Sequence, residues 1–294
     1  NMAVPFLTCG EMLSDPKNAS RSLAELAIDY ESERGGLKRD TVLQKMIDIV
    51  KLLQRSVMEG VAGTQFEDRI LHFQCGKFKD EMDSGRLLDA GMLNRMVLYV
   101  TALMEVKSSM GIIVAAPTAG SCGALPGACL AAGEAMAWSD ETIARGMLAA
   151  GLIGIFVTVR SSFAAEVTGC QGETGVGAAM AAAALVDMHG GTVNQALAAA
   201  SMALQNTLGL VCDPVANRVE VPCLGRNISA AANALTSANV ALADFAEVIP
   251  LDEVIATHNT IGRSLPRELR CTCLGGLSIT ESAKKIELQL AQRD

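Results

Sequence analysis

From residue 111 onward the chain alternates between apolar stretches rich in alanine and glycine and short breaks rich in glycine, proline or polar residues. Residues 192–208 show the apolar pattern clearly, because valine and leucine recur there at spacings of four and seven residues. Thr192 and Gln195 have the spacing of a capping box, which predicts where this helix begins. Since Gly and Ala let helix backbones approach closely, this part of the chain predicts a bundle of buried helices.

The first 110 residues differ from the rest because they carry many charges of both signs. A second start signal, Ser278 followed by Glu281, predicts a polar helix near the C-terminal end. Short β-branched runs occur at residues 112–115 and 154–159, so the signals for strands are weak. Three segments of the first 110 residues repeat apolar side chains every three or four positions and predict amphipathic helices, namely 20–30, 41–58 and 87–110.

These patterns predict an all-α fold, in which Ala- and Gly-rich buried helices are surrounded by longer amphipathic ones. The composition agrees, because 50% of the residues are hydrophobic and only 3% are aromatic, as a core of closely packed small side chains requires. We expect a single domain over residues 1–294. It consists of a charged helical lead-in, 1–110, and a helical core, 111–294, with the functional residues in loops between helices.

Charge and hydropathy exclude several classes of function. The net charge is −8, with 24 Lys and Arg against 32 Asp and Glu, so we expect no nucleic-acid partner. The apolar stretch 147–159 lies between Arg145 and Arg160 and is shorter than the roughly 20 residues of a membrane span, which predicts a buried helix and no membrane partner. Nine cysteines and the lack of a signal segment predict a cytoplasmic protein whose thiols are free or metal-bound.

Three cysteines, Cys170, Cys212 and Cys223, lie in breaks between apolar stretches. They are 42 and 11 residues apart, so only the fold can bring them together. Three thiolates from separate loops can hold an iron-sulfur cluster and leave one iron without a protein ligand, as a Lewis acid. Isolated cysteines are also common as buried structural residues, and zinc usually takes four ligands at closer spacings. Spacing alone leaves these possibilities open.

Four segments then make a specific resemblance. In this order, APTAGSCGALPG, AEVTGCQGETGVG, CDPVANRVEVPCLGRN and LPRELRCTCLGG resemble the catalytic alpha part of the iron-sulfur-dependent L-serine dehydratases. The similarity covers residues 111–276, and the charged lead-in fits the helical lead-in of the same part.

The resemblance implies a reaction and a cofactor. Members of this family convert L-serine to pyruvate and ammonia with a 4Fe-4S cluster whose open iron activates the substrate hydroxyl. The matching cysteines are Cys170, Cys212 and Cys223. The resemblance also implies amino-acid degradation that feeds gluconeogenesis, and an oxygen-sensitive enzyme. The chain has no lysine between Lys107 and Lys284, so the glycine-rich breaks offer no anchor for pyridoxal phosphate, and we expect none.

The sequence offers few candidates for the catalytic base and for residues that contact the substrate. Of the three histidines, His258 is our candidate for the catalytic base, whereas His189 has the position of a helix cap and His72 lies in the charged lead-in. For the substrate we expect hydroxyl contacts from Thr118 and Ser121 and a carboxylate contact from one or both nearby arginines. Those arginines are Arg267 and Arg270.

Two further features bear on regulation and assembly. Cys271 and Cys273 form a C-x-C motif, and either thiol is a candidate to cap the open iron against oxygen, although two buried thiols are the simpler reading. Members of the family also contain a beta part with a serine-rich motif and a histidine, which this chain lacks. We therefore expect a separate beta subunit, which could supply the base, and an oligomer.

Two alternative functions remain open. One is a cysteine desulfidase or another β-eliminating lyase that uses the same cluster. The other is a structural or regulatory protein whose three thiols bind zinc or nothing.

Overall fold

The computed structural model describes residues 4–292. Over this range the chain forms thirteen α-helices joined by loops and short 3-10 turns and has no strand, so the predicted all-α class is confirmed. The helices are α1 (Cys9–Ser14), α2 (Leu23–Gly35), α3 (Arg39–Ala62), α4 (Cys75–Asp83), α5 (Met92–Ser108), α6 (Ala124–Ala135), α7 (Asp140–Arg160), α8 (Ala165–Thr168), α9 (Thr174–Met188), α10 (Val193–Gln205), α11 (Cys223–Leu242), α12 (Leu251–Ser264) and α13 (Glu281–Ala291).

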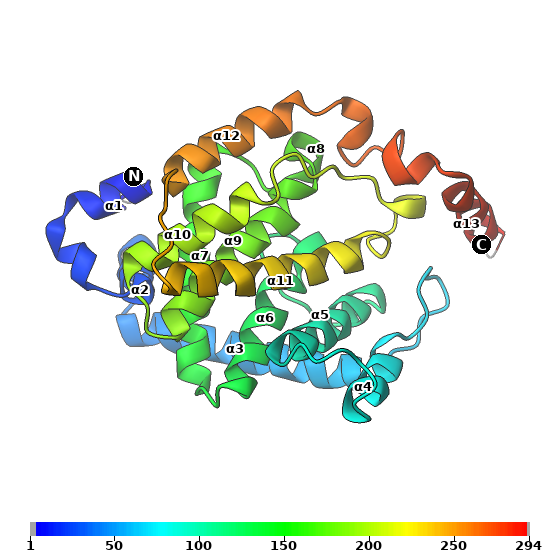
Figure 1. Ribbon diagram of the computed structural model, residues 1–294, viewed down its shortest axis with the longest axis horizontal. Helices are drawn as coiled ribbons and strands as arrows, with labels where there is room; N and C mark the ends of the chain where they lie inside the picture. The colour runs from blue at the N-terminus through cyan, green and yellow to red at the C-terminus, as the bar shows by residue number, and fades with distance from the viewer. Residues whose placement is uncertain (1–3, 293–294) are drawn as a thin grey trace.

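Helix α9 lies at the centre of the molecule and is buried along nearly its whole length. Helices α6, α7, α10 and α11 pack around it (Figure 1). The sequence explains the close packing, because most of α9 is alanine and glycine. At Gly146 of α7, an added Cβ would lie 2.3 Å from the Met188 side chain of α9, so only glycine allows these two helices to approach this closely.

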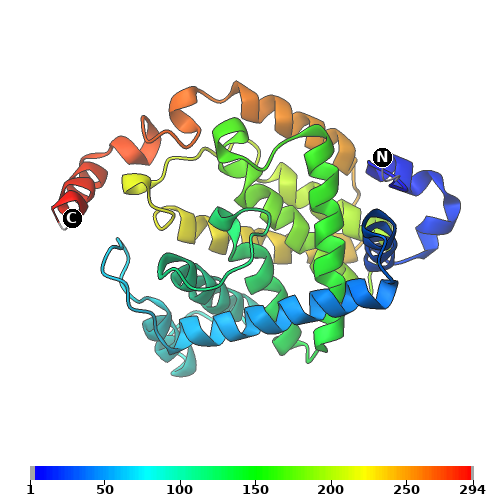
Figure 2. The same ribbon diagram turned by 180° about the vertical axis from the view of Figure 1, so that it is seen from behind.

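The predicted lead-in helices are present, with ends that differ by a few residues. Helices α2, α3 and α5 correspond to the segments 20–30, 41–58 and 87–110. Helix α3 runs along the outside of the bundle and packs on α5 and α7 (Figure 2). The capping box at Thr192 and Gln195 is confirmed and opens α10.

The second start signal was wrong in position. Helix α13 begins at Glu281 and its N-cap is Thr280, whose hydroxyl accepts the Ala283 N–H. Ser278 lies two residues earlier, buried in a 3-10 turn, where its hydroxyl donates to Pro214 O at 2.7 Å. A tertiary contact thus occupies the side chain that the local pattern assigned to a cap.

Neither β-branched run forms a strand. Residues 112–115 are irregular, and 154–159 belong to α7. Among the described residues, α7 is also the one helix that is long and apolar enough to span a membrane, and 67% of its apolar window is buried inside the fold. The core helix of a soluble protein meets the same criteria, so the length and composition of α7 do not point to a membrane.

The C-terminal arm, residues 265–292, extends from the end of α12 along one side of the bundle (Figure 1). It runs beside the loop 212–222, which separates α10 from α11. Cys212 and Arg270 form an isolated parallel bridge between the two segments. Helix α13 packs on the 3-10 turn Val215–Asn217 of the same loop.

Candidate active site

The GCQGETG segment forms a tight connection between α8 and α9. Cys170–Gly172 is a 3-10 turn, preceded by Gly169 with φ of +73°. A Cβ at Gly169 would lie 2.7 Å from Leu210 O, so glycine is required both by its φ and by the close approach of the second chain segment. Gln171 N–H donates to the same Leu210 O at 3.1 Å. The Cys170 turn is therefore pressed against the segment that leads to Cys212.

Gln171 joins three parts of the chain, and the sequence analysis did not single it out. Its side chain is fully buried. The amide Nε2 donates to His258 O of α12 at 2.7 Å, and Oε1 accepts Gly209 N–H at 2.8 Å. A glutamine next to a candidate ligand is a weak signal in sequence, because its partners lie 38 and 87 residues away.

Cys170 and Cys212 come together in one small buried cluster, with Cys271 packed against them. Cys271 N–H donates to Cys212 O at 2.9 Å, so the backbones of the two residues are paired. The two thiols also share a hydrogen bond. This bond, together with burial, raises the pKa of Cys212, and the same bond lowers the pKa of Cys271. Of the two cysteines in the C-x-C motif, Cys271 is thus the one that packs with Cys170 and Cys212. The Cys273 thiol points toward Pro214 O instead.

Cys223 begins α11 on the other side of this group. Burial raises the pKa of its thiol to about 12, and the electrostatic influence of Cys170 and Glu173 adds to the shift. Burial also raises the pKa of Cys170. The three predicted cysteines are therefore electrostatic neighbours in the fold.

The thiols are spread more widely than the ligands of a single ion. Among residues 4–292, no three His, Cys, Asp or Glu side chains are grouped closely enough to hold one metal ion. A 4Fe-4S cluster is larger, with each cysteine bound to a different iron, so its ligands need not converge on one point. The donor set fits such a group in chemistry, because it offers three cysteine sulfurs from segments that are separate in the chain and linked by hydrogen bonds.

Thr118 and Ser121 lie in the APTAGS loop, which contacts Glu173 just after the Cys170 turn. The two residues cap the short 3-10 turn Ala119–Ser121 reciprocally, and Ser121 is fully buried. The Thr118 hydroxyl donates to Glu173 Oε1 at 2.9 Å. A Cβ at Gly120 would lie 2.8 Å from the same oxygen, so this loop rests directly against the Glu173 carboxylate.

Glu173 is the side chain at which the site residues meet. Burial raises the pKa of its carboxyl, and the hydrogen bond from Thr118 partly offsets that effect. Its negative charge adds to the raised pKa of Cys170, Cys212 and Cys223. In the sequence, Glu173 is one acidic residue within the AEVTGCQGETGVG segment, and nothing in the pattern distinguishes it. Its role becomes visible because the APTAGS loop packs on it.

Lys107, at the end of α5, also reaches this region. Its Nζ donates to Val219 O at 2.9 Å, and burial lowers its pKa, while Cys223 and Glu173 partly counteract that shift. The long lysine-free stretch therefore does not leave the site without a lysine, because the lead-in supplies one. The absence of pyridoxal phosphate stays a prediction.

Asn227 holds the APTAGS loop to the start of α11 and is fully buried. Its Nδ2 donates to Gly120 O and Cys223 O, both at 2.9 Å. Its Oδ1 accepts the N–H groups of Gly123 and Ala124 at 3.3 and 3.1 Å. One amide thus satisfies four main-chain groups and fixes the loop relative to Cys223.

Arg226, the residue before Asn227, performs a similar task for the Cys212 loop. Its guanidinium donates to Val211 O and to Asp213 Oδ1, each at 2.8 Å. Its positive charge lowers the pKa of Cys170 and Cys223 relative to what burial alone would give. A cation beside two thiols favours their thiolate forms, which are the forms that bind metal.

The two predicted carboxylate contacts differ in position. Arg270 is half-buried next to Cys212, and its Nε is buried without a hydrogen-bond partner. Arg267 is exposed in the 3-10 turn Arg267–Leu269. Of the two arginines, Arg270 is therefore the one that the fold brings to the thiols.

His258 is fully buried in α12. Its Nδ1 and the Ser161 hydroxyl are 2.7 Å apart, and its Nε2 is buried without a partner. Burial lowers the pKa of the imidazole, and the main chain of Gln171 partly offsets this shift. The ring thus lies beside the Cys170 turn. The other two histidines lie as expected, since His189 forms the C-cap of α9 and His72 is exposed.

Comparison with known proteins agrees with this arrangement. The family model described as serine dehydratase alpha chain matches residues 18–278. The chain is 35% identical over 285 residues to the probable L-serine dehydratase alpha chain of Bacillus subtilis, covering 97% of this chain and 95% of the relative. It is 35% identical over 280 residues to the L-serine dehydratase alpha chain of Peptoniphilus asaccharolyticus, covering 95% and 96%.

A third relative is longer. L-serine dehydratase TdcG of Escherichia coli K12 is 40% identical over 185 residues, which are 62% of this chain and 40% of the relative. The match to the family model and the two relatives of similar length cover the same loops that meet at Glu173. The chain therefore belongs to the serine dehydratase alpha chain family.

Proposed function

We propose that this protein is the alpha subunit of an L-serine dehydratase, which converts L-serine to pyruvate and ammonia. The observation that carries the proposal is the meeting of the three cysteine loops and the APTAGS loop around Glu173. The names of the two relatives of similar length support the same reaction. Water leaves L-serine in the elimination and is taken up again when the resulting imine hydrolyses, so the net products are pyruvate and ammonia.

Cys170, Cys212 and Cys223 would hold a 4Fe-4S cluster. When bound, that group supplies a Lewis acid that makes the substrate hydroxyl a better leaving group. Arg226 supports the ligands, because its charge favours the thiolate forms of Cys170 and Cys223.

The other residues of the site would bind and orient the substrate. The Glu173 carboxylate is suited to the ammonium group of L-serine, and the unpaired Nε of Arg270 is suited to its carboxylate. Thr118 and Ser121 provide hydroxyls beside Glu173.

His258 is the proposed base within this chain, since its Nε2 is buried and has no partner. A histidine of a separate beta chain is the alternative source, and the relatives' names as alpha chains agree with such a partner. We further propose that the enzyme is cytoplasmic, oligomeric and sensitive to oxygen.

The test is a comparison of matched cysteine variants under anaerobic conditions. Protein labelled with iron-57 is measured by Mössbauer spectroscopy with and without L-serine, and pyruvate is assayed with its beta chain present. We expect a four-iron signal in which one iron changes on addition of L-serine. Cys223→Ser should lose both this signal and pyruvate formation, whereas Cys129→Ala, a buried thiol of α6 away from the site, should keep both.

Other results would point to other functions. A four-iron signal that responds to L-cysteine and not to L-serine would favour a desulfidase. A colourless protein that holds zinc, or no metal, after anaerobic reconstitution would overturn the proposed cofactor.

A further inference from the structure

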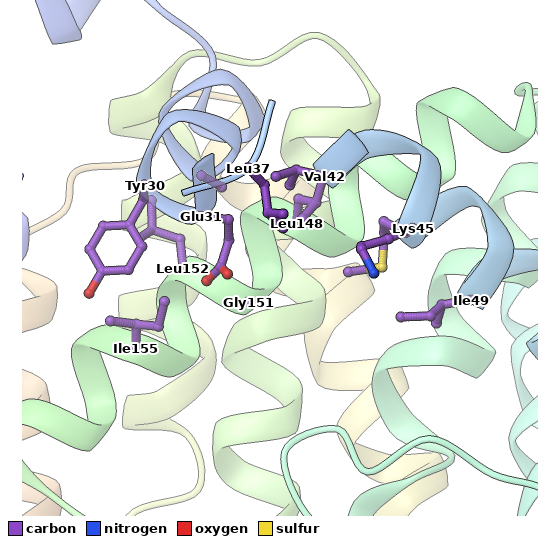
Figure 3. A pocket seen from close by; sticks show the side chains of 12 residues that line it. Tyr30, Glu31, Leu37, Val42, Lys45, Ile49, Leu148, Gly151, Leu152 and Ile155 are labelled. Atoms are coloured by element: carbon purple, nitrogen blue, oxygen red, sulfur yellow. The ribbon is translucent and has the colours of Figure 1, made fainter. Parts of the chain in front are cut away.

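Helices α2, α3 and α7 line a cavity of about 280 Å³ that is open to solvent on one side and belongs to none of the loops described above (Figure 3). This volume lies at the lower end of the range for small-molecule sites, so it suits a small metabolite. The wall is mostly apolar and includes Tyr30, Leu37, Val42, Leu148, Leu152 and Ile155.

Gly151 forms part of the wall in the middle of α7, and packing does not explain it. A Cβ at Gly127 or Gly146 would meet atoms of a neighbouring helix within 3 Å, whereas a Cβ at Gly151 would meet no atom within 4 Å. Glycine in a helix interior costs about 1 kcal/mol relative to alanine. The structure thus keeps space open at Gly151 at a cost in helix stability, which is expected if something occupies that space.

Two charged side chains line the cavity, with Leu148 between them in the view of Figure 3. Glu31 extends from α2 toward Gly151, and Lys45 extends from α3 (Figure 3). Glu31 uses Oε2 to accept from Arg34 at 2.6 Å, which leaves Oε1 available. Lys45 is exposed, and no ion pair holds it within the described part of the chain. The site therefore offers one anionic and one cationic contact beside an apolar wall.

We propose that this cavity binds a free α-amino acid with an aliphatic side chain of about the size of leucine. The carboxylate pairs with Lys45, the ammonium donates to Glu31 Oε1, and the side chain fills the space over Gly151. A ligand with only one of the two charged groups leaves a partner unused, and a ligand without a side chain leaves the apolar wall exposed. This inference is independent of the reaction proposed above.

The first experiment measures binding to the whole chain by isothermal titration calorimetry. L-Leucine should bind with a stoichiometry of one. Glycine, 4-methylpentanoate and 3-methylbutylamine, which lack the side chain, the ammonium and the carboxylate, should each bind at least about fivefold more weakly. The proposal is overturned if L-leucine does not bind, or if either analogue with one charged group binds as tightly as L-leucine.

Variants locate the site. Gly151→Leu places a side chain in the cavity and should weaken L-leucine binding at least about tenfold, and Gly151→Ala, which adds one methyl group to the same space, should weaken it by a smaller factor. Melting temperatures show whether both variants fold. Lys45→Gln should weaken binding about fivefold, and Lys51→Gln, an exposed lysine of the same helix outside the cavity, should not. Unchanged affinity in folded Gly151→Leu would place the L-leucine elsewhere and refute the assignment.

Discussion

At the scale of single residues, the active site is organised by buried amides that bind main-chain groups from several loops. Gln171 joins the Cys170 turn to Gly209 and His258. Asn227 does the same for the APTAGS loop and Cys223. Because each amide both donates and accepts, no substitution by a carboxylate or an apolar side chain can replace it fully. Both side chains bind main-chain groups, so their effect is to fix the loops of the site relative to one another.

Replacing Asn227 by Asp tests this positioning. The carboxylate cannot donate to Gly120 O and Cys223 O, so two buried carbonyls lose their partner and a charge is buried. We expect the free energy of unfolding to fall by about 2–3 kcal/mol, measured by urea denaturation. Asn239→Asp, at an exposed position of the same helix, should change it by less than about 0.5 kcal/mol. Equal effects of the two variants would contradict the role of Asn227.

His258 predicts a pH dependence of stability. Burial lowers its pKa below the ordinary value of 6.5, so the unfolded chain binds a proton that the folded protein does not. Stability is therefore lost as the pH falls below about 6.5, by about 1.4 kcal/mol for each unit of difference in pKa. In His258→Gln this loss between pH 7.5 and 5 should be smaller than in the parent, whereas His72→Gln should behave like the parent. Thermal melting at each pH gives the comparison.

At the scale of elements, helix ends decide where the chemistry lies. The core helices are mostly apolar, so most of the candidate site side chains are found where one helix stops and the next begins, and His258 within α12 is an exception. Helix α9 shows this well, because the Cys170 turn lies immediately before its first residue and His189 closes its other end. Helix starts that are fixed by defined caps therefore help to fix the positions of the site residues.

The capping box of α10 allows the contribution of a helix start to the free energy of unfolding to be measured directly. Thr192→Ala removes the acceptor of the Gln195 N–H bond and should lower the free energy of unfolding by about 1 kcal/mol. Thr260→Ala, an exposed threonine within α12 whose hydroxyl binds the preceding turn, should have little effect or stabilise slightly. Chemical denaturation of both variants provides the test, and a larger loss for Thr260→Ala would show that the box contributes little.

At the scale of the whole molecule, segments from both ends of the chain enclose the Cys212 loop. From the lead-in, the N–H groups of Ile70 and Leu71 donate to the buried Glu220 carboxylate. From the C-terminal arm, Leu277 N–H donates to Asp213 Oδ2 at 2.7 Å. The Cys212 loop is thus held from two sides by segments about 150 and 64 residues away.

Ser278→Ala tests how firmly the arm is held. The substitution leaves the buried Pro214 O with only the weaker Cys273 thiol as a donor, which should cost about 1 kcal/mol locally. We expect faster amide hydrogen exchange over residues 276–291, detected by mass spectrometry. Ser282→Ala, at an exposed position of α13, is the matched control and should leave the exchange unchanged. If the two variants exchange alike, the Ser278 contact does not hold the arm.

The amino-acid sequence by itself determined the helical class, the buried Ala- and Gly-rich helices and the motifs of the family, because small side chains, apolar periodicity and the capping box at Thr192 act over one or two helical turns. It also placed the three cysteines at breaks between apolar stretches, although Cys223 is the first residue of α11 and not part of a loop. Only the tertiary structure decided which side chains face them. Glu173, Lys107 and Asn227 reach the site through contacts between residues far apart in the chain, which depend on how whole helices pack. The same reason explains the misplaced start of α13, since Pro214, 64 residues earlier, binds the Ser278 hydroxyl.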